Sequence, residues 1–207
     1  MTSAVVEGAD DRPGHWGDER TGGDDEFAQM IDALRLLQER ITGTSPPRSL
    51  LAEMTEVFGD LAARLEPFAV PERRQVTGRR TDLPGRGQAL VPVFHADVSS
   101  DHEVRGRLTF SRYYLGGNGA AHGGTIPLMF DEVLGRLANS GERPLSRTAY
   151  LHVNYRNITP IGVELRLEAR FEREEGRKRY LSAVIYHGDV LTADAEGLFV
   201  ALRPGQP

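Results

Sequence analysis

The feature that most constrains this chain is a glycine-rich turn that leads directly into an apolar helical pattern near the middle of the sequence. The turn ends in the run His122, Gly123 and Gly124. After it, apolar residues recur at helical spacing, namely Ile126, Phe130, Val133, Leu134 and Leu137. Such a stripe must be buried. The sequence therefore predicts one amphipathic helix packed against a sheet.

Two features of this helix are suited to a role in a chemical reaction. The first backbone N–H groups of a helix have no internal partner and carry partial positive charge. Glycines at 123 and 124 let an oxygen approach these groups closely, which suits a carbonyl that is becoming an anion. Asp131 lies off the apolar stripe and supplies a carboxylate. Taken singly, glycine-rich turns and helix-flank aspartates are common, and only their combination points to a site.

The spacing of these groups favours a site between subunits. His122 and Asp131 are nine positions apart in the sequence, which corresponds to about 13 Å of rise in a continuous helix. One chain therefore cannot easily bring both groups to one small reacting group. Two helices packed antiparallel around a two-fold axis could do so, and we expect a homodimer or a dimer of dimers.

Alternating apolar and polar residues predict strands on both sides of the helix. The clearest lies within 163–171, and further runs occupy 104–110, 148–155, 180–187 and 190–202. The run 90–94 is also apolar, and its Pro92 indicates an edge strand or a bend. In the run 148–155, Thr148 falls on the opposite face from Tyr155. Helix and strand do not alternate in a βαβ rhythm, so an antiparallel α+β fold is expected rather than a parallel nucleotide-binding sheet.

The rest of the chain suggests four segments. Two apolar stripes, in 25–42 and 50–66, predict a helical hairpin that begins at Asp24 or Asp25, with Ser49 as a cap for its second helix. We expect this hairpin to cover part of the main domain or its partner. The expected segments are 1–24, a disordered acidic tail; 25–68, the hairpin; 69–88, an arginine-rich linker; and 89–207, the main domain.

Composition excludes several classes of protein. The chain has 207 residues, no cysteine and a formal net charge of −5, so disulfides and cysteine-ligated zinc are excluded. Neither a basic face for nucleic acid nor an apolar run of membrane-helix length is present in the sequence. The six histidines show no metal-ligand spacing. We expect a cytoplasmic protein that uses no metal.

The motifs resemble one known family. Gly119, His122, Gly123, Gly124 and Asp131 match the signature of the PaaI-like acyl-CoA thioesterases, in which an acidic residue follows the histidine by nine positions. The later pair Thr148 and Tyr155 resembles that family's strand after the helix. The resemblance covers about residues 88–203. It implies the hotdog fold, in which a curved antiparallel sheet wraps one long helix.

The resemblance also implies a reaction, the hydrolysis of an acyl-CoA thioester. The Gly123 N–H would polarise the thioester carbonyl, with Gly124 beside it in the substrate site. Asp131 of the partner subunit would act as general base or as nucleophile. Thr148 would hold the water or the carboxylate, and His122 would orient the loop or contact the thioester. Coenzyme A is part of the substrate, so no separate cofactor is implied.

One position departs from the family pattern. The family has an asparagine six positions before the histidine, where this chain has Gly116, and Asn118 follows two positions later. Asn118 either takes over the contact with the substrate or the contact is lost. Arg177 and Lys178 could meet the phosphates of coenzyme A, although a charged hairpin flank is the more common explanation. The alternatives to a thioesterase are a non-catalytic acyl-CoA-binding protein and a hotdog hydratase or dehydratase.

Overall fold

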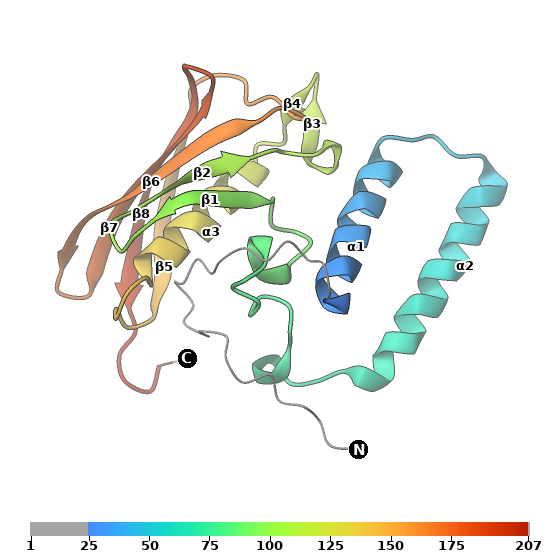
Figure 1. Ribbon diagram of the computed structural model, residues 1–207, viewed down its shortest axis with the longest axis horizontal. Helices are drawn as coiled ribbons and strands as arrows, with labels where there is room; N and C mark the ends of the chain where they lie inside the picture. Colours follow the sequence, from blue (N-terminus) through green and yellow to red (C-terminus); the bar gives the residue numbers. More distant parts are fainter. Residues whose placement is uncertain (1–24, 207) are drawn as a thin grey trace.

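The computed structural model describes residues 25–206, and its centre is a six-stranded antiparallel sheet curled around one helix (Figure 1). The helices are α1 (Glu26–Thr42), α2 (Arg48–Leu65) and α3 (Thr125–Ala138), with short 3-10 turns at η1 (Glu66–Phe68), η2 (Glu72–Arg74), η3 (Pro84–Gly87) and η4 (Arg112–Tyr114). The strands are β1 (Phe94–Ser99), β2 (Glu103–Leu108), β3 (Leu115–Gly117), β4 (Ala120–Ala121), β5 (Ser146–Tyr155), β6 (Leu165–Glu175), β7 (Lys178–His187) and β8 (Val190–Ala201). The large sheet has the order β1-β2-β6-β7-β8-β5, and β3 pairs with β4.

The predicted helix is α3, and its apolar stripe forms the core of the domain. The five stripe residues, Ile126, Phe130, Val133, Leu134 and Leu137, are each no more than 3 % exposed. The facing sheet supplies the alternating side chains of β6 and β7, including Leu165, Leu167, Leu181 and Ile185. Burying each large apolar side chain contributes about 1.5–3 kcal/mol. The stripe therefore fixes which side of α3 meets the sheet.

The end of α3 is tied to the strand that follows it. Asn139 is the C-cap, and its Nδ2 donates to the Gly135 carbonyl at 2.8 Å. Its Oδ1 accepts bonds from both the N–H and the hydroxyl of Ser146, the first residue of β5. This one side chain therefore fixes β5 beside the helix.

The apolar run 90–94 is mostly not a strand, and it leads into the edge strand β1, in agreement with the edge or bend that Pro92 indicates. Residues 90–93 are irregular and β1 begins at Phe94. Pro92 has no N–H to donate to a strand neighbour, which explains why pairing starts after it. Val91 and Phe94 are nevertheless buried, so the apolar run serves the core without being a strand.

The two N-terminal helices run antiparallel on the open side of the curled sheet (Figure 1). Asp25 caps α1 by accepting bonds from the N–H groups of Phe27 and Ala28. The predicted Ser49 cap is wrong, because α2 begins at Arg48 after Pro47 and has no side-chain cap. Ala28 and Ile31 of α1 are buried, whereas α2 has no buried residue. The acidic tail predicted for residues 1–24 lies outside the described residues.

The segment between α2 and β1 is anchored to α3 through an ion pair. The Arg86 guanidinium donates to both carboxylate oxygens of Glu132 at 3.0 and 2.6 Å, and Glu132 is 8 % exposed. Arg80 pairs with Asp25 and Asp82 and holds the pKa of both carboxyl groups below its usual value. These two arginines of the segment are therefore engaged within the chain.

None of the helices in the described part of the chain combines the length and apolar character needed to span a bilayer.

Candidate active site

Asp131 lies on the one open stripe of α3. Its side chain is exposed, while Phe130 and Glu132 beside it are buried. The open stripe consists of Leu128, Asp131 and Gly135, which are partly or fully exposed and lie at helical spacing on one face. Thr148 of β5 donates its hydroxyl to Asp131 Oδ1 at 2.8 Å. The structure thus brings together two of the predicted site residues and leaves their carboxylate open to a reactant.

The turn before α3 is held by backbone bonds and by the His122 ring. The His122 N–H donates to the Tyr114 carbonyl at 2.7 Å, and the His122 carbonyl accepts from the Thr125 N–H. His122 Nδ1 accepts from the Gly124 N–H at 3.0 Å. A ring nitrogen that accepts such a bond carries no proton, so the ring proton is on Nε2. His122 therefore shapes the turn through Nδ1 and keeps an Nε2–H donor.

Gly123 presents the free donor of this turn. Within residues 25–206, its N–H donates to no protein acceptor. Its carbonyl accepts a bond from the Tyr155 hydroxyl at 2.7 Å. Neither the N–H nor the carbonyl of Gly123 bonds within α3. The N–H is therefore available to an external oxygen at the positive end of the helix.

Tyr155 is a site residue to which the sequence assigned no role, and a β-bulge explains why. In a regular strand, residues seven apart point to opposite faces, so alternation separates Thr148 from Tyr155. The pairing of β5 with β8 shifts between Thr148 and Tyr150. The extra residue reverses the alternation, and both side chains reach the two ends of the α3 site, at Asp131 and at Gly123.

Within one chain, the Asp131 carboxylate lies far from the free N–H of Gly123. Gly123 and Asp131 are eight positions apart, and Asp131 is in the second turn of α3. The rise between them is about 12 Å if it follows helical spacing. An oxygen held at the Gly123 N–H therefore lies beyond hydrogen-bond reach of the Asp131 carboxylate of the same chain.

Comparison with known proteins agrees with this architecture. Residues 118–195 match the family model of the thioesterase superfamily. The solved thioesterase superfamily protein RHA08564 is 27 % identical, with a TM-score of 0.74 over 86 % of this chain and 91 % of its own. This chain has the hotdog fold predicted from the sequence.

Two curated proteins similar to this chain are named acyl-coenzyme A thioesterases. THEM5 of Mus musculus is 29 % identical over 129 residues, which cover 60 % of this chain and 50 % of THEM5. THEM4 of Xenopus laevis is 35 % identical over 97 residues, which cover 44 % of this chain and 42 % of THEM4. The chain therefore spans half or less of the length of these relatives.

Gly116 and Asn118 lie in the hairpin formed by β3 and β4. A Cβ atom at Gly116 would come within 2.8 Å of the His122 Cα, so a side chain there would displace the turn. Asn118 occupies the tip of the hairpin with a φ of 49°, followed by Gly119 at 77°. An Asn-Gly pair with two positive φ angles is the preferred sequence for a tight hairpin turn. Asn118 thus has a structural role at the tip.

Arg177 and Lys178 are not brought to the Gly123 end of α3. Arg177 donates to the Ala201 carbonyl at 2.8 Å, and Arg179 donates to the carbonyl of Ala138, the last residue of α3. The 14 residues of α3 separate this end from Gly123 by about 20 Å. Arg179 is fully buried.

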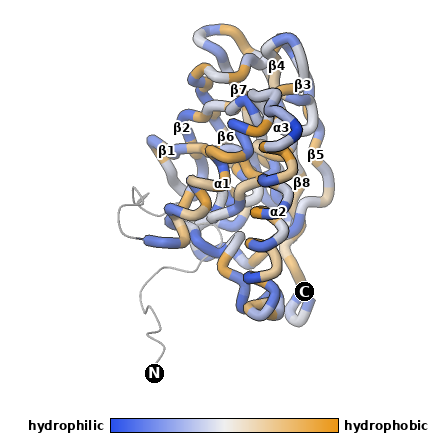
Figure 2. Tube along the Cα trace, turned by 90° about the vertical axis from the view of Figure 1, so that its right-hand side faces the viewer, coloured by the Kyte–Doolittle hydropathy of each residue, from blue (hydrophilic) through white to orange (hydrophobic). Residues whose placement is uncertain are grey.

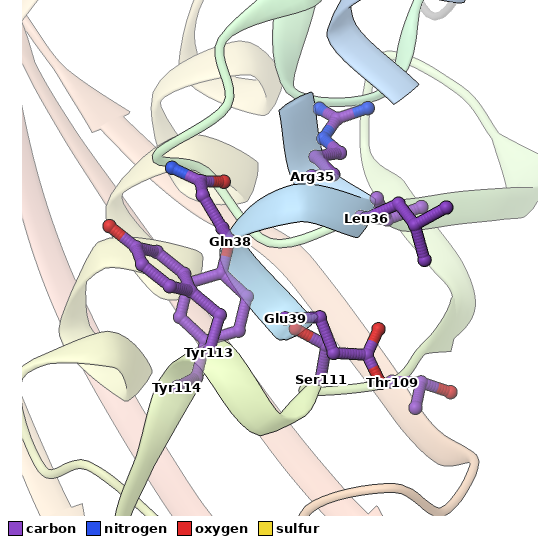
Figure 3. Close-up of a pocket in the computed structure, with 9 residues that line it drawn as sticks. Arg35, Leu36, Gln38, Glu39, Thr109, Ser111, Tyr113 and Tyr114 are labelled. Carbon is purple, nitrogen blue, oxygen red and sulfur yellow. The ribbon is translucent and has the colours of Figure 1, made fainter. Parts of the chain in front are cut away.

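A hollow of about 240 Å³ lies between α1 and the chain around η4 (Figure 3). Burial raises the pKa of Tyr114 in its wall to about 12, and the Tyr114 hydroxyl donates to the Leu90 carbonyl. The predicted site residues do not line this hollow, but Tyr114 connects it to the turn through the bond to His122. The lining residues are Arg35, Leu36, Gln38, Glu39, Val93, Thr109, Ser111, Tyr113 and Tyr114.

Within the described residues, no group of three or more histidine, aspartate or glutamate side chains is placed to hold a metal ion.

Proposed function

We propose that this chain is a PaaI-like thioesterase that hydrolyses acyl-CoA at sites shared between two subunits. Each site would combine the Gly123 N–H and His122 of one protomer with Asp131 and Thr148 of the other. The observation that carries the proposal is the pairing of a free N–H at the start of α3 with an open carboxylate that the same chain holds out of its reach. The names of the two relatives, acyl-coenzyme A thioesterases, support the choice of substrate.

The chemistry of the site follows from these groups. The thioester carbonyl accepts a bond from Gly123 N–H, which stabilises the negative charge that develops on its oxygen. As general base, Asp131 takes a proton from water, and the resulting hydroxide adds to the carbonyl carbon. The tetrahedral intermediate then collapses, the C–S bond breaks, and the thiolate of coenzyme A leaves. As nucleophile, Asp131 would instead form a mixed anhydride that water hydrolyses.

Thr148 and His122 have supporting roles in this proposal. Thr148 donates to Asp131 Oδ1 and so directs the other oxygen of the carboxylate toward the water or the carbonyl. His122 holds the Gly124 N–H through Nδ1, which orients the neighbouring Gly123 N–H. Its Nε2–H can donate to the thioester. Asn118 at the hairpin tip, together with Gly124, would border the substrate, and Gly116 gives the turn its space.

A hydrolysis screen tests the proposal. The full chain is incubated with short, long and aromatic acyl-CoAs, and the released thiol is measured. We expect turnover with at least one of these classes, together with release of the free acid. Binding of acyl-CoA without thiol release would instead support the non-catalytic alternative. Addition of water across an enoyl-CoA double bond would support a hydratase.

Restoring the family's asparagine at position 116 should lower activity rather than raise it. In Gly116→Asn, the new Cβ clashes with the His122 backbone and moves the turn that presents the Gly123 N–H. A shift of about 1 Å in such a group can cost about 100-fold in rate. We expect a loss in kcat/KM of this order, measured with the best substrate of the screen.

The matched control is Gly188→Asn in the β7–β8 turn. Gly188 has a φ of 58°, which asparagine tolerates, and an added Cβ there meets nothing within 4 Å. Its kcat/KM should equal that of the wild type. A Gly116→Asn variant with higher activity than the wild type would show that position 116 still offers a contact to the substrate.

A further inference from the structure

The helix α2 presents an apolar stripe that the described part of the chain leaves uncovered. None of its 18 residues is buried. Leu51, Phe58, Leu61 and Leu65 share one face and are between 38 % and 64 % exposed. An isolated helix of this length is only marginally stable in water, and helices in proteins gain most of their stability from packing such a face. The stripe therefore calls for a partner surface.

The neighbouring helix α1 carries a second uncovered stripe. Its Ala28 and Ile31 pack on the domain, whereas Met30, Leu34 and Ile41 lie on another face and are at least 40 % exposed. Figure 1 shows α2 antiparallel to α1, on the side of α1 away from the sheet. Two antiparallel helices with open stripes form half of a helix bundle. A second copy of the chain offers the same two stripes, so the surface is complementary to itself.

The position of α2 coincides with the side from which a second copy must arrive. The sheet curls around α3, and the helices α1 and α2 stand on its open side in both views (Figures 1 and 2). The open stripe of α3 carries Asp131, which in the proposed function needs Gly123 of another protomer. A protomer that docks on this stripe to complete the site would approach from the side of the sheet on which α2 lies.

The size of the interface also favours a contribution from α2. A stable, specific interface buries about 800 Å² on each partner. The open stripe of α3 offers only Leu128, Asp131 and Gly135, next to the free edge of β5. The 18 residues of α2 extend about 27 Å and would enlarge this contact considerably.

The arrangement of the N-terminal region has a counterpart in a solved relative. RHA08564 aligns with 86 % of this chain at a TM-score of 0.74. Residues 89–207 make up less than 86 % of the chain. The aligned part must therefore also include residues of the region of α1 and α2. The helical region is therefore part of an architecture that a second protein shares.

We infer that α2 is an intersubunit arm whose apolar stripe packs on the second copy of this chain that completes the Gly123–Asp131 site. This inference rests on the proposed function, because it takes the second copy from the shared site. The arm would stabilise the dimer without touching the substrate.

Charge placed on the stripe tests the inference. Phe58→Glu puts a carboxylate in the proposed contact, and Ala63→Glu puts the same group on the opposite face of α2. Sedimentation equilibrium of the full chain should show that Phe58→Glu raises the dimer dissociation constant by about 10- to 100-fold. Ala63→Glu should leave it unchanged. Neither residue is buried within its own chain, and circular dichroism of both variants verifies that the fold is retained.

A cross-link identifies the contact directly. The chain has no cysteine, so Ala62→Cys provides a single thiol beside the stripe for a benzophenone maleimide label. In a mixture of ¹⁴N and ¹⁵N chains, mass spectrometry distinguishes cross-links between chains from those within a chain. We expect cross-links between differently labelled chains. Cross-links confined to one chain would overturn the inference.

Other outcomes separate this inference from the proposed function. If the Phe58→Glu dimer is as stable and as active as the wild type, the inference that α2 is an intersubunit arm is wrong. The proposed shared site is unaffected by this outcome. If the wild-type chain is active and remains monomeric at high micromolar concentration, both the shared site and the role of α2 as an arm are wrong. Binding of α2 to phosphatidylglycerol vesicles, abolished by Phe58→Glu with no effect on the dimer, would assign the stripe to a membrane surface and overturn the inference.

Discussion

Replacing Asp131 by asparagine is expected to lower kcat/KM for acyl-CoA hydrolysis by about 10²- to 10⁴-fold, the range typical of a general base. Asparagine has nearly the same shape and can still accept the 2.8 Å bond from the Thr148 hydroxyl. It cannot take a proton from water or attack the thioester. The loss should appear in kcat, because the Gly123 N–H that holds the carbonyl is unchanged. Initial rates of thiol release over a range of substrate concentrations measure it.

Asp97→Asn is the matched control for this substitution. Asp97 is an exposed aspartate of β1 that pairs with Arg107 at 2.9 Å, away from α3. Its loss should leave kcat and KM unchanged. Both variants should sediment as the wild type does. An Asp131→Asn protein that keeps more than a tenth of the wild-type kcat would rule out the carboxylate as base or nucleophile.

Mixing two inactive variants tests that Asp131 acts across the subunit boundary. Gly123→Leu blocks the approach to the N–H of the turn, and Asp131→Asn removes the carboxylate. In a mixed dimer of the two, one site has Gly123 and Asp131 and the other has neither. Random exchange makes half of the dimers mixed, so about a quarter of the wild-type activity should return. Absence of recovery, with mixed dimers demonstrated, would place both groups in one chain's site.

Local periodicity explains how much of this fold the sequence predicts. The stripe from Ile126 to Leu137 repeats at helical spacing, and it is buried as expected. The run 163–171 alternates, and most of it forms the first part of β6. Asp131 and Gly123 could be singled out because a helix start and an off-stripe carboxylate can both be recognised from neighbours within a few positions.

The features that the sequence did not reveal depend on distant contacts or on irregular backbone. The bulge in β5 that brings Thr148 and Tyr155 to the same site inserts one residue, and alternation alone cannot locate it. The pair of Arg86 and Glu132 spans 46 positions and leaves no periodic signal. The apolar stripe of α2 resembles that of a packed helix, although residues 25–206 provide no surface that buries it.

Arg179→Met is expected to destabilise the domain by about 3–5 kcal/mol, because it leaves two carbonyls without the charged donor that satisfies them. The Arg179 side chain is fully buried. Its Nη1 donates to the carbonyls of Ala138 and Pro144 at 2.7 and 2.8 Å, and its Nε donates to Glu174 at 3.3 Å. It thereby satisfies the negative end of α3 and the loop that leads to β5. Methionine fills similar space but leaves both carbonyls unpaired.

Thermal and denaturant unfolding measure this loss, which corresponds to a fall in melting temperature of about 6–20 °C for a domain of this size. Arg177→Met is the matched control, because Arg177 is exposed and donates to a single carbonyl, that of Ala201, at 2.8 Å. It should cost no more than about 1 kcal/mol. A loss of equal size in the two variants would mean that charge at the β6–β7 hairpin, rather than the buried bonds to the end of α3, stabilises the domain. A loss confined to Arg179→Met would show that the bonds from Arg179 to the carbonyls of Ala138 and Pro144 stabilise the domain.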